Sequence, residues 1–377
     1  MLPREFALES HFAKWEFAAR YHFTASDVET MSVAELLRMA DPGDERRWYD
    51  ARLGYIETQG TEEARSAIAG TYASVEPDDV LAFAGAEEGL YCAVHAILEP
   101  GDHAIVVVPN YQSLESVPLT ICDVSGIGLR AARGWSIDIE EFQSLLRPTT
   151  RLVGLNFPNN PTGANATPET FSEIINICRA RGIYVLNDEV YRGVESDERK
   201  RLSHIADLYE RGLSLNVTSK AYGFPGLRVG WIACKDRELL KRMLRLKHYL
   251  SVCNNVLGEI LATIVLKNSE QILSRNRALV RENLTILRSF FARHSKLFEW
   301  YEPDGGCVFF PRYLGGDVER LCESLIRDAG IFTLPSSTYR SDLAPTPADR
   351  FRVGFGRRGL ETILTALDTF LQGYRAA

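Results

Sequence analysis

Short apolar runs alternate with amphipathic helical patterns through the middle of this chain. The runs are rich in Val, Ile and Leu, and they cover residues 103–108, 151–157, 183–187, 213–217 and 229–234. Helical patterns lie between them, for example at 87–98 and 168–181. Strands that alternate with helices predict a mainly parallel sheet that helices cover on both faces. We therefore expect an α/β fold whose ligands bind beyond the carboxyl ends of the strands.

The later part of the chain has a different pattern. From about Leu239 it is mostly helical, and strand-like runs follow at Cys307–Arg312 and Phe351–Gly356 before a last helix from about Leu360. We interpret this part as a smaller α+β domain, onto which the first forty or so residues pack. The predicted division is an N-terminal segment at 1–44, a large domain at 45–265 and a small domain at 266–377.

Composition excludes several classes of partner. The chain has 377 residues, of which 45% are hydrophobic and 25% charged, as in soluble globular proteins. Its net charge of −7 comes without a basic run, which argues against nucleic acid or a membrane surface as a partner. No apolar stretch reaches the length of a membrane span, and the N-terminus lacks the apolar core of a signal peptide. The seven cysteines form no metal-ligand cluster, so we expect free thiols, no metal site and a cytoplasmic protein.

The segment from Ser219 to Gly230 places a lysine and an arginine on a small-residue loop directly after the run at 213–217. A lysine at the end of a buried strand loses solvation, so its pKa falls, and a partly neutral amine can attack an aldehyde. The planar donor fork of Arg228 suits a phosphate. An aldehyde site at Lys220 near a phosphate site at Arg228 predicts pyridoxal 5'-phosphate (PLP) as the cofactor. The simpler alternative is a surface Ser-Lys pair before a glycine turn.

Two other loops offer groups that suit the same ligand. Gly85 precedes a helical pattern, so the backbone N–H groups of Ala86 and Glu87 would face an anion at the helix N-terminus. The alternative for this loop is a plain helix start. Tyr111 follows the run at 103–108, where its ring would stack on a planar cofactor or simply lie in a loop.

Polar residues also follow the second and third runs. Asn160 precedes Pro161, which restricts its backbone and holds its amide ready to bind a phenolic oxygen. Asp188 ends the run at 183–187, where a buried carboxylate needs a partner such as a protonated pyridine nitrogen. Tyr191 would reach the same ring. The alternatives are a turn around Asn160 and a helix cap at Asp188.

These segments, and their order along nearly the whole chain, resemble those of the class I/II aminotransferases of PLP fold type I. The segments that carry the resemblance are Tyr55, the Gly85 loop, Pro109-x-Tyr111, Asn159 to Gly163, Asp188-x-x-Tyr191, Ser219-Lys220, Arg228 and Arg352. Within that family, the blocks from Ser219 to Trp231 and from Arg352 to Gly356 are most similar to capreomycidine synthase-like enzymes. The stretch from Trp15 to Leu37 shows a weaker similarity to the same group.

The resemblance implies a role for each matched residue. Lys220 would hold PLP as an internal aldimine and move a proton, with Asp188 on the pyridine nitrogen and Tyr191 on the ring oxygen. These three are the implied catalytic residues. The implied cofactor-binding set is Gly85, Ala86, Glu87, Tyr111, Asn160, Asp188, Tyr191, Ser219, Lys220, Arg228 and Tyr55.

The family also implies a substrate site and a partner. Arg352 would clamp the α-carboxylate of an amino acid, and Asn160 would lie beside it. Tyr55 would reach the phosphate in the other subunit of a homodimer with shared active sites. The implied activity is transamination between an amino acid and a 2-oxo acid.

Four positions depart from the family pattern. Val217 and Ala86 lack hydroxyls that often bind the phosphate, which leaves more of the phosphate binding to backbone amides and Arg228. Ser336 and Asp27 stand where substrate preference is usually set. The carboxylate of Asp27 would favour a substrate with a cationic side chain. Alternatively, Asp27 and Glu29 are both exposed to solvent.

Two other activities remain open at this point. The same cofactor serves lyases and cyclases, so the chain also fits a capreomycidine synthase-like enzyme acting on a β-substituted or basic amino acid. A PLP-binding sensor in a transcription regulator is the third alternative. It needs a DNA-binding domain, for which the first forty residues are too few and lack a basic patch.

Overall fold

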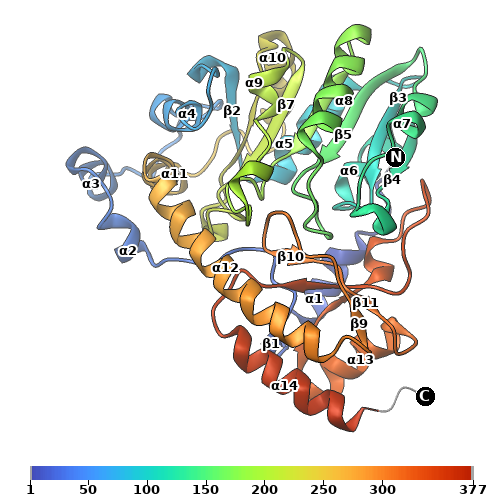
Figure 1. Ribbon diagram of the computed structural model, residues 1–377. Helices are drawn as coiled ribbons and strands as arrows, with labels where there is room; N and C mark the ends of the chain where they lie inside the picture. The colour runs from blue at the N-terminus through green and yellow to red at the C-terminus, as the bar shows by residue number, and fades with distance from the viewer. Residues whose placement is uncertain (1, 375–377) are drawn as a thin grey trace.

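The computed structural model describes residues 2–374 (Figure 1). Within these residues a seven-stranded sheet has the strand order β2-β8-β7-β6-β5-β3-β4. Its strands are β2 (Val80–Phe83), β3 (His103–Val108), β4 (Asp123–Gly128), β5 (Thr150–Asn156), β6 (Tyr184–Asp188), β7 (Gly212–Val217) and β8 (Gly230–Ala233). Strand β8 runs antiparallel to β2 and β7, and the other neighbouring strands are parallel. The predicted, mainly parallel sheet is therefore confirmed.

Five of these strands match the apolar runs to within one residue at each end. The prediction misses β2 and β4. Strand β2 has only four residues, too few to show a periodicity. Strand β4 lies at the sheet edge and contains Asp123, Gly126 and Gly128, which are poor strand formers. Gly126 is needed there because a Cβ would lie 2.7 Å from that of Leu343.

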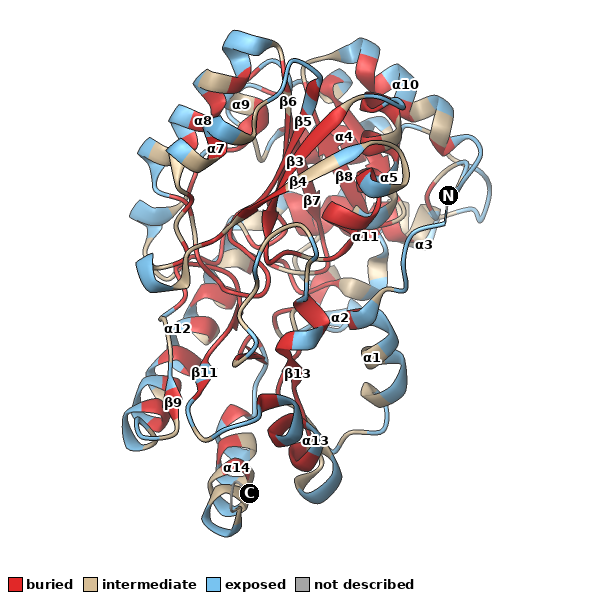
Figure 2. Ribbon diagram, turned by 90° about the vertical axis from the view of Figure 1, so that its right-hand side faces the viewer, coloured by how far each residue is buried: buried red, intermediate tan, exposed pale blue. Residues whose placement is uncertain are grey.

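Helices cover both faces of the sheet (Figure 2). One face carries α5 (Ala86–Ile97) and α10 (Arg237–Lys247), and the other carries α7 (Ile139–Leu145), α8 (Pro168–Arg181) and α9 (Ile205–Leu208). The helix predicted at 168–181 is confirmed with the same bounds. Thr167 caps its first turn, and Gly182 ends it in the left-handed conformation.

A smaller lobe lies below the sheet in Figure 1 and contains elements from both ends of the chain. Its elements are α1 (Ala7–Trp15), β1 (Tyr21–His22), α12 (Ser269–Arg293), β9 (Phe298–Glu299), β10 (Val308–Phe309), β11 (Arg312–Tyr313), α13 (Val318–Ala329), β12 (Ile331–Phe332), β13 (Leu334–Pro335), β14 (Phe351–Gly354) and α14 (Leu360–Gly373). Strand β1 pairs in parallel with β12, which joins the N-terminal segment to this lobe. The single strand predicted at 307–312 is wrong: it divides into β10 and β11 around Pro311, which has no N–H to donate.

A third group of helices lies beside the sheet. These are α2 (Val33–Leu37), α3 (Pro42–Tyr49), α4 (Glu62–Ala69) and α11 (Val256–Lys267), and α2, α3 and α4 all contact α11. The division at 44 and 265 stays a prediction, and both positions fall inside helices of this group. In the described part of the chain, no helix is long and apolar enough to cross a membrane. All seven cysteines lie in this part, and each is a free thiol.

Candidate active site

A cavity of about 560 Å³ lies beyond the carboxyl ends of the sheet strands. At the ends of these strands and in the loops that follow them, its lining includes Tyr111, Asn160, Asp188, Tyr191, Ser219 and Lys220. Ala86 and Glu87 of α5, together with Arg228 and Arg352, also line it. The structure thus brings together most of the residues selected from the sequence. A larger groove of about 770 Å³ between α1 and α13 contains none of them.

Lys220 follows β7 and extends into the cavity. Its amine donates a hydrogen bond of 2.8 Å to the Oγ atom of Ser26. Burial lowers the pKa of this amine, and Arg352 lowers it further, while the Asp27 carboxylate opposes the change. The result is an amine that loses its proton, and becomes a nucleophile, more readily than a lysine in water.

Asp188 ends β6 on the same side of the sheet. Burial raises the pKa of its carboxyl group to about 7, although a hydrogen bond of 3.1 Å from the Val190 N–H and the nearby Lys220 act in the opposite direction. A cation placed against this carboxylate would lower its pKa again. The site therefore favours a positively charged partner for Asp188.

Tyr191 lies three residues beyond Asp188, with only 1% of its surface exposed. Its hydroxyl has no hydrogen-bond partner of normal geometry, although Ser26 lies nearby. A buried hydroxyl without a partner is uncommon in proteins, because it forgoes the bonds that water would offer. Since Tyr191 lines the cavity, this hydroxyl is available to a ligand.

Arg352, on β14, is 1% exposed and has no carboxylate partner among the described residues. Its guanidinium donates to the Oγ1 and backbone oxygen of Thr24 at 3.2 and 2.7 Å, to Asn160 Oδ1 at 3.1 Å and to the Tyr339 hydroxyl at 2.8 Å. Buried arginines normally pair with an anion. The Arg352 guanidinium is therefore fixed in place by neutral oxygen atoms, and its positive charge has no anion to balance it. Because Arg352 lines the cavity, it suits a carboxylate ligand.

The same contacts fix the amide of Asn160. Arginine can only donate hydrogen bonds, so the atom that faces Arg352 must be Oδ1. The Nδ2 group then points the other way, and it has no protein acceptor in the part of the chain described here. Asn160 therefore offers a donor to a ligand in the cavity.

A concave anion site forms where α5 begins. Gly85 precedes the helix with φ +104°, and a Cβ there would lie 2.5 Å from Arg228 Nη2. Gly230 is equally constrained, because its Cβ would lie 2.6 Å from the Ala86 nitrogen. The unpaired N–H groups of a helix N-terminus and a guanidinium thus converge. The Ser219 hydroxyl, which lines the cavity, is also buried without a partner.

Tyr55 is the one predicted site residue that lies far out on the surface. Its side chain is 93% exposed, on the segment between α3 and α4, and it does not line the cavity of its own chain. This placement agrees with a contact to a second chain and excludes one to its own site. Gly85 contacts Arg228 but is not among the cavity-lining residues.

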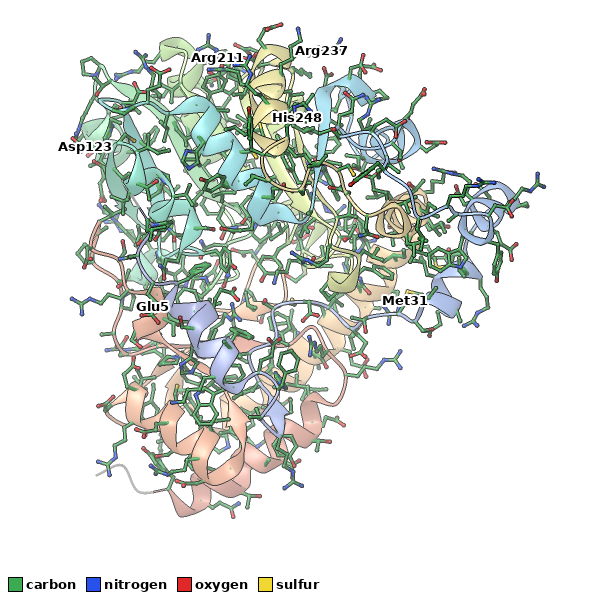
Figure 3. The ribbon with its side chains drawn as sticks, turned by 180° about the vertical axis from the view of Figure 1, so that it is seen from behind. Glu5, Met31, Asp123, Arg211, Arg237 and His248 are labelled. Carbon is green, nitrogen blue, oxygen red and sulfur yellow. The ribbon has the colours of Figure 1, made fainter. Side chains whose placement is uncertain are left out.

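The N-terminal segment contributes more to the site than the sequence indicates. Helix α1 crosses the junction of the two lobes, with Glu5 just before it (Figure 3). Glu9 of this helix accepts a hydrogen bond of 2.6 Å from the Tyr111 hydroxyl, and Phe6 contacts the Tyr111 ring at 4.9 Å between centroids. No local motif marks these residues, because their partners lie about one hundred residues away in the sequence.

Asp27 is buried and forms an ion pair. It is 6% exposed, and Arg357 donates three hydrogen bonds of 2.8 to 3.1 Å to its carboxylate. Asp27 is therefore not solvated, and that expectation is corrected. Asp27 and Arg357 both line the cavity, so a preference for a cationic substrate stays a prediction. Glu29 accepts a hydrogen bond of 2.9 Å from the Arg358 N–H.

Comparison with known proteins identifies the family. Residues 44–367 match the family described as aminotransferase class I and II. The chain belongs to this family. It is 28% identical to capreomycidine synthase of Streptomyces vinaceus, over 98% of this chain and 95% of that protein. A PLP-dependent aminotransferase from Streptococcus suis has a similar structure, with a TM-score of 0.91 and 27% identity over 99% of this chain and 98% of that one. The PLP-dependent cyclase OrfR gives a TM-score of 0.89 and 26% identity over the same shares.

The cofactor of this aminotransferase-family protein is PLP, and the site fits that molecule. The glycine-lined helix N-terminus and Arg228 suit its phosphate, and Asp188 suits its protonated ring nitrogen. The unpaired hydroxyl of Tyr191 and the free amide donor of Asn160 suit its ring oxygen. Val217 lines the cavity without a hydroxyl, as the sequence indicates, so Ser219 and Arg228 are left as the side chains that would bind the phosphate.

Proposed function

We propose that this protein is an aminotransferase that moves an amino group between an amino acid and a 2-oxo acid. The observation that carries the proposal is the convergence of Lys220, Asp188 and the uncompensated Arg352 on one cavity. When bound, PLP withdraws electrons from the substrate α-carbon. The residues of the chain would then decide which bond of that carbon reacts.

Each residue would have a defined task in this reaction. Arg352 would hold the α-carboxylate through two parallel N–H groups, with Asn160 alongside it. The Lys220 amine would hold the cofactor and carry a proton from the substrate α-carbon, a task that its lowered pKa supports. The Asp188 carboxylate would keep the proton on the ring nitrogen. Helix α1 would cover the substrate and exclude water.

A fold-type-I lyase or cyclase is the second candidate. The observation that favours it is the similarity to capreomycidine synthase, which extends over 98% of this chain. The same Lys220, Asp188 and Arg352 would serve elimination or ring closure equally well. Asp27 lines the cavity, where a basic substrate would compete with Arg357 for its carboxylate.

Product analysis over a panel of amino acids separates the two candidates. Alanine, glutamate, aromatic, basic and β-substituted amino acids are each added to the purified protein without a 2-oxo acid. Transamination predicts one equivalent of 2-oxo acid and conversion of PLP to pyridoxamine phosphate. Repeated release of ammonia, water or thiol while PLP persists would establish the lyase or cyclase instead.

Arg352→Lys is expected to raise the KM for the amino acid roughly tenfold, because lysine keeps the charge but loses the bidentate fork. The PLP affinity should remain unchanged. Arg358→Ala provides the control, since Arg358 is exposed and lies outside the cavity. Equal KM values for Arg352→Lys and the unmodified protein would remove Arg352 from the substrate site.

We further propose a cytoplasmic homodimer in which Tyr55 reaches the phosphate site of the other chain. Tyr55→Phe is then expected to weaken PLP binding by roughly tenfold, because one hydrogen bond to a charged group is lost. Tyr49→Phe is the matched control, as Tyr49 is also exposed and has no assigned role. Sedimentation should show a particle of two chains. A fully active single chain would contradict the shared site.

A further inference from the structure

Lys247, the last residue of α10, is a buried cation that the reaction does not use. Its side chain is 0% exposed, and its amine donates to the backbone oxygens of Thr58 and Ala82, both at 2.7 Å, and to Asn254 Oδ1 at 3.1 Å. The three acceptors match the three N–H groups of the ammonium form of this amine. Within residues 2–374 no acidic side chain forms an ion pair with it. Burying a charge in this way is unfavourable, so hydrophobic packing does not explain its presence.

The acceptors of Lys247 belong to the segments that approach the phosphate. Ala82 lies on β2, three residues before Gly85, and Thr58 lies three residues after Tyr55. Asn254 lies in the loop that joins α10 to α11. One amine therefore binds the backbone of two segments that we assign to phosphate binding. The segment before Gly85 would bind the phosphate of its own chain, and the segment after Tyr55 would bind that of the other chain.

Glu88 connects the segment before Gly85 to the α10–α11 loop. It lies in the first turn of α5, and its carboxylate accepts hydrogen bonds from the Ala84 N–H at 2.7 Å and the Ser251 N–H at 3.1 Å. Ala84 directly precedes Gly85, and Ser251 lies in the same α10–α11 loop as Asn254. Helices α5 and α10 pack together, and both are visible from behind in Figure 3.

Gly85 lies directly beside the guanidinium of Arg228. The space for a Cβ is already filled by Arg228, so a shift of the loop changes the distance between the helix N-terminus and the guanidinium. We propose that Lys247 is a positioning residue for the phosphate of PLP, and that Glu88 assists it by holding Ala84. The proposal rests on the cofactor site described above and not on the type of reaction.

Comparison of PLP with pyridoxal, which lacks the phosphate, tests this role. Full-length protein freed of cofactor is titrated with each compound, and the ratio of the two dissociation constants is measured without any amino acid. Lys247→Met keeps the length of the side chain and removes the donors. Lys241→Met is the control on the same helix, because Lys241 is exposed and pairs with Glu238.

Lys247→Met is expected to weaken PLP binding roughly tenfold or more while pyridoxal binding changes little. Glu88→Gln, which is less disruptive because it removes only one of two acceptors, is expected to change the ratio in the same direction by a smaller factor.

Folded variants that bind both compounds with an unchanged ratio would overturn the proposal and leave Lys247 with a structural role alone. If Lys247→Met fails to fold, Glu88→Gln decides by the same ratio. An unmodified protein that binds PLP and pyridoxal equally would instead overturn the phosphate site itself, and this proposal with it.

Discussion

Lys220→Ala is expected to reduce turnover by roughly 10³-fold or more, because both the covalent attachment of the cofactor and the proton carrier are lost. The variant should still bind PLP without a covalent bond, since Arg228, Asp188 and the start of α5 remain. Absorption spectra of the purified protein would then lack the band of the lysine-bound cofactor.

Lys200→Ala is a suitable control for Lys220→Ala. Lys200 lies at the surface outside the cavity, where it pairs with Asp304. Its replacement should leave the spectrum and the turnover unchanged. Full turnover in Lys220→Ala would mean that another group performs both tasks.

Asp188→Asn is expected to lower turnover by roughly 10²–10³-fold. Asparagine can still accept the hydrogen bond from the Val190 N–H, so the loop should keep its shape while the charge is removed. The neutral amide no longer keeps the proton on the ring nitrogen, which weakens the electron withdrawal by PLP. Each 1.36 kcal/mol of barrier corresponds to a factor of ten in rate, so the expected loss corresponds to about 3–4 kcal/mol. Steady-state kinetics with a saturating amino acid, together with a PLP titration, would measure the effect.

The expected pattern for Asp188→Asn is a large loss in kcat with a smaller loss of PLP affinity. Asp207→Asn serves as the control, because Asp207 is also a carboxylate that accepts backbone N–H bonds, but away from the cavity. Near-normal kcat in Asp188→Asn would show that the ring nitrogen has another partner.

The sequence predicts the sheet well because its central strands are continuous apolar runs. Strand β3 is buried along its whole length, and its bounds agree with the run at 103–108. Parallel strands then bring their carboxyl ends to one edge, which explains why Asn160, Asp188 and Lys220 meet although they are far apart in the chain. Strand β4, with two glycines at an edge, shows no such signal.

The rest of the site depends on contacts that no local pattern reveals. Ser26 accepts the hydrogen bond from Lys220 across 194 positions of the sequence, and Thr24 contacts Arg352 across 328. Both lie in the N-terminal segment, whose position is determined by the pairing of β1 with β12. The ion pair of Asp27 with Arg357 has the same origin, so the solvation of Asp27 could not be predicted from its neighbours in sequence.

The central claim is that this cavity holds PLP through Lys220. A second lysine, Lys247, is also desolvated, and burial lowers the pKa of both amines. They differ in that Lys220 lines the cavity, whereas Lys247 is surrounded by its three acceptors. Borohydride reduction of the PLP-bound protein, followed by peptide mapping, locates the attachment directly. We predict that the cofactor is found on the peptide containing Lys220; its recovery on Lys247 or on any other lysine would contradict the assignment of this site.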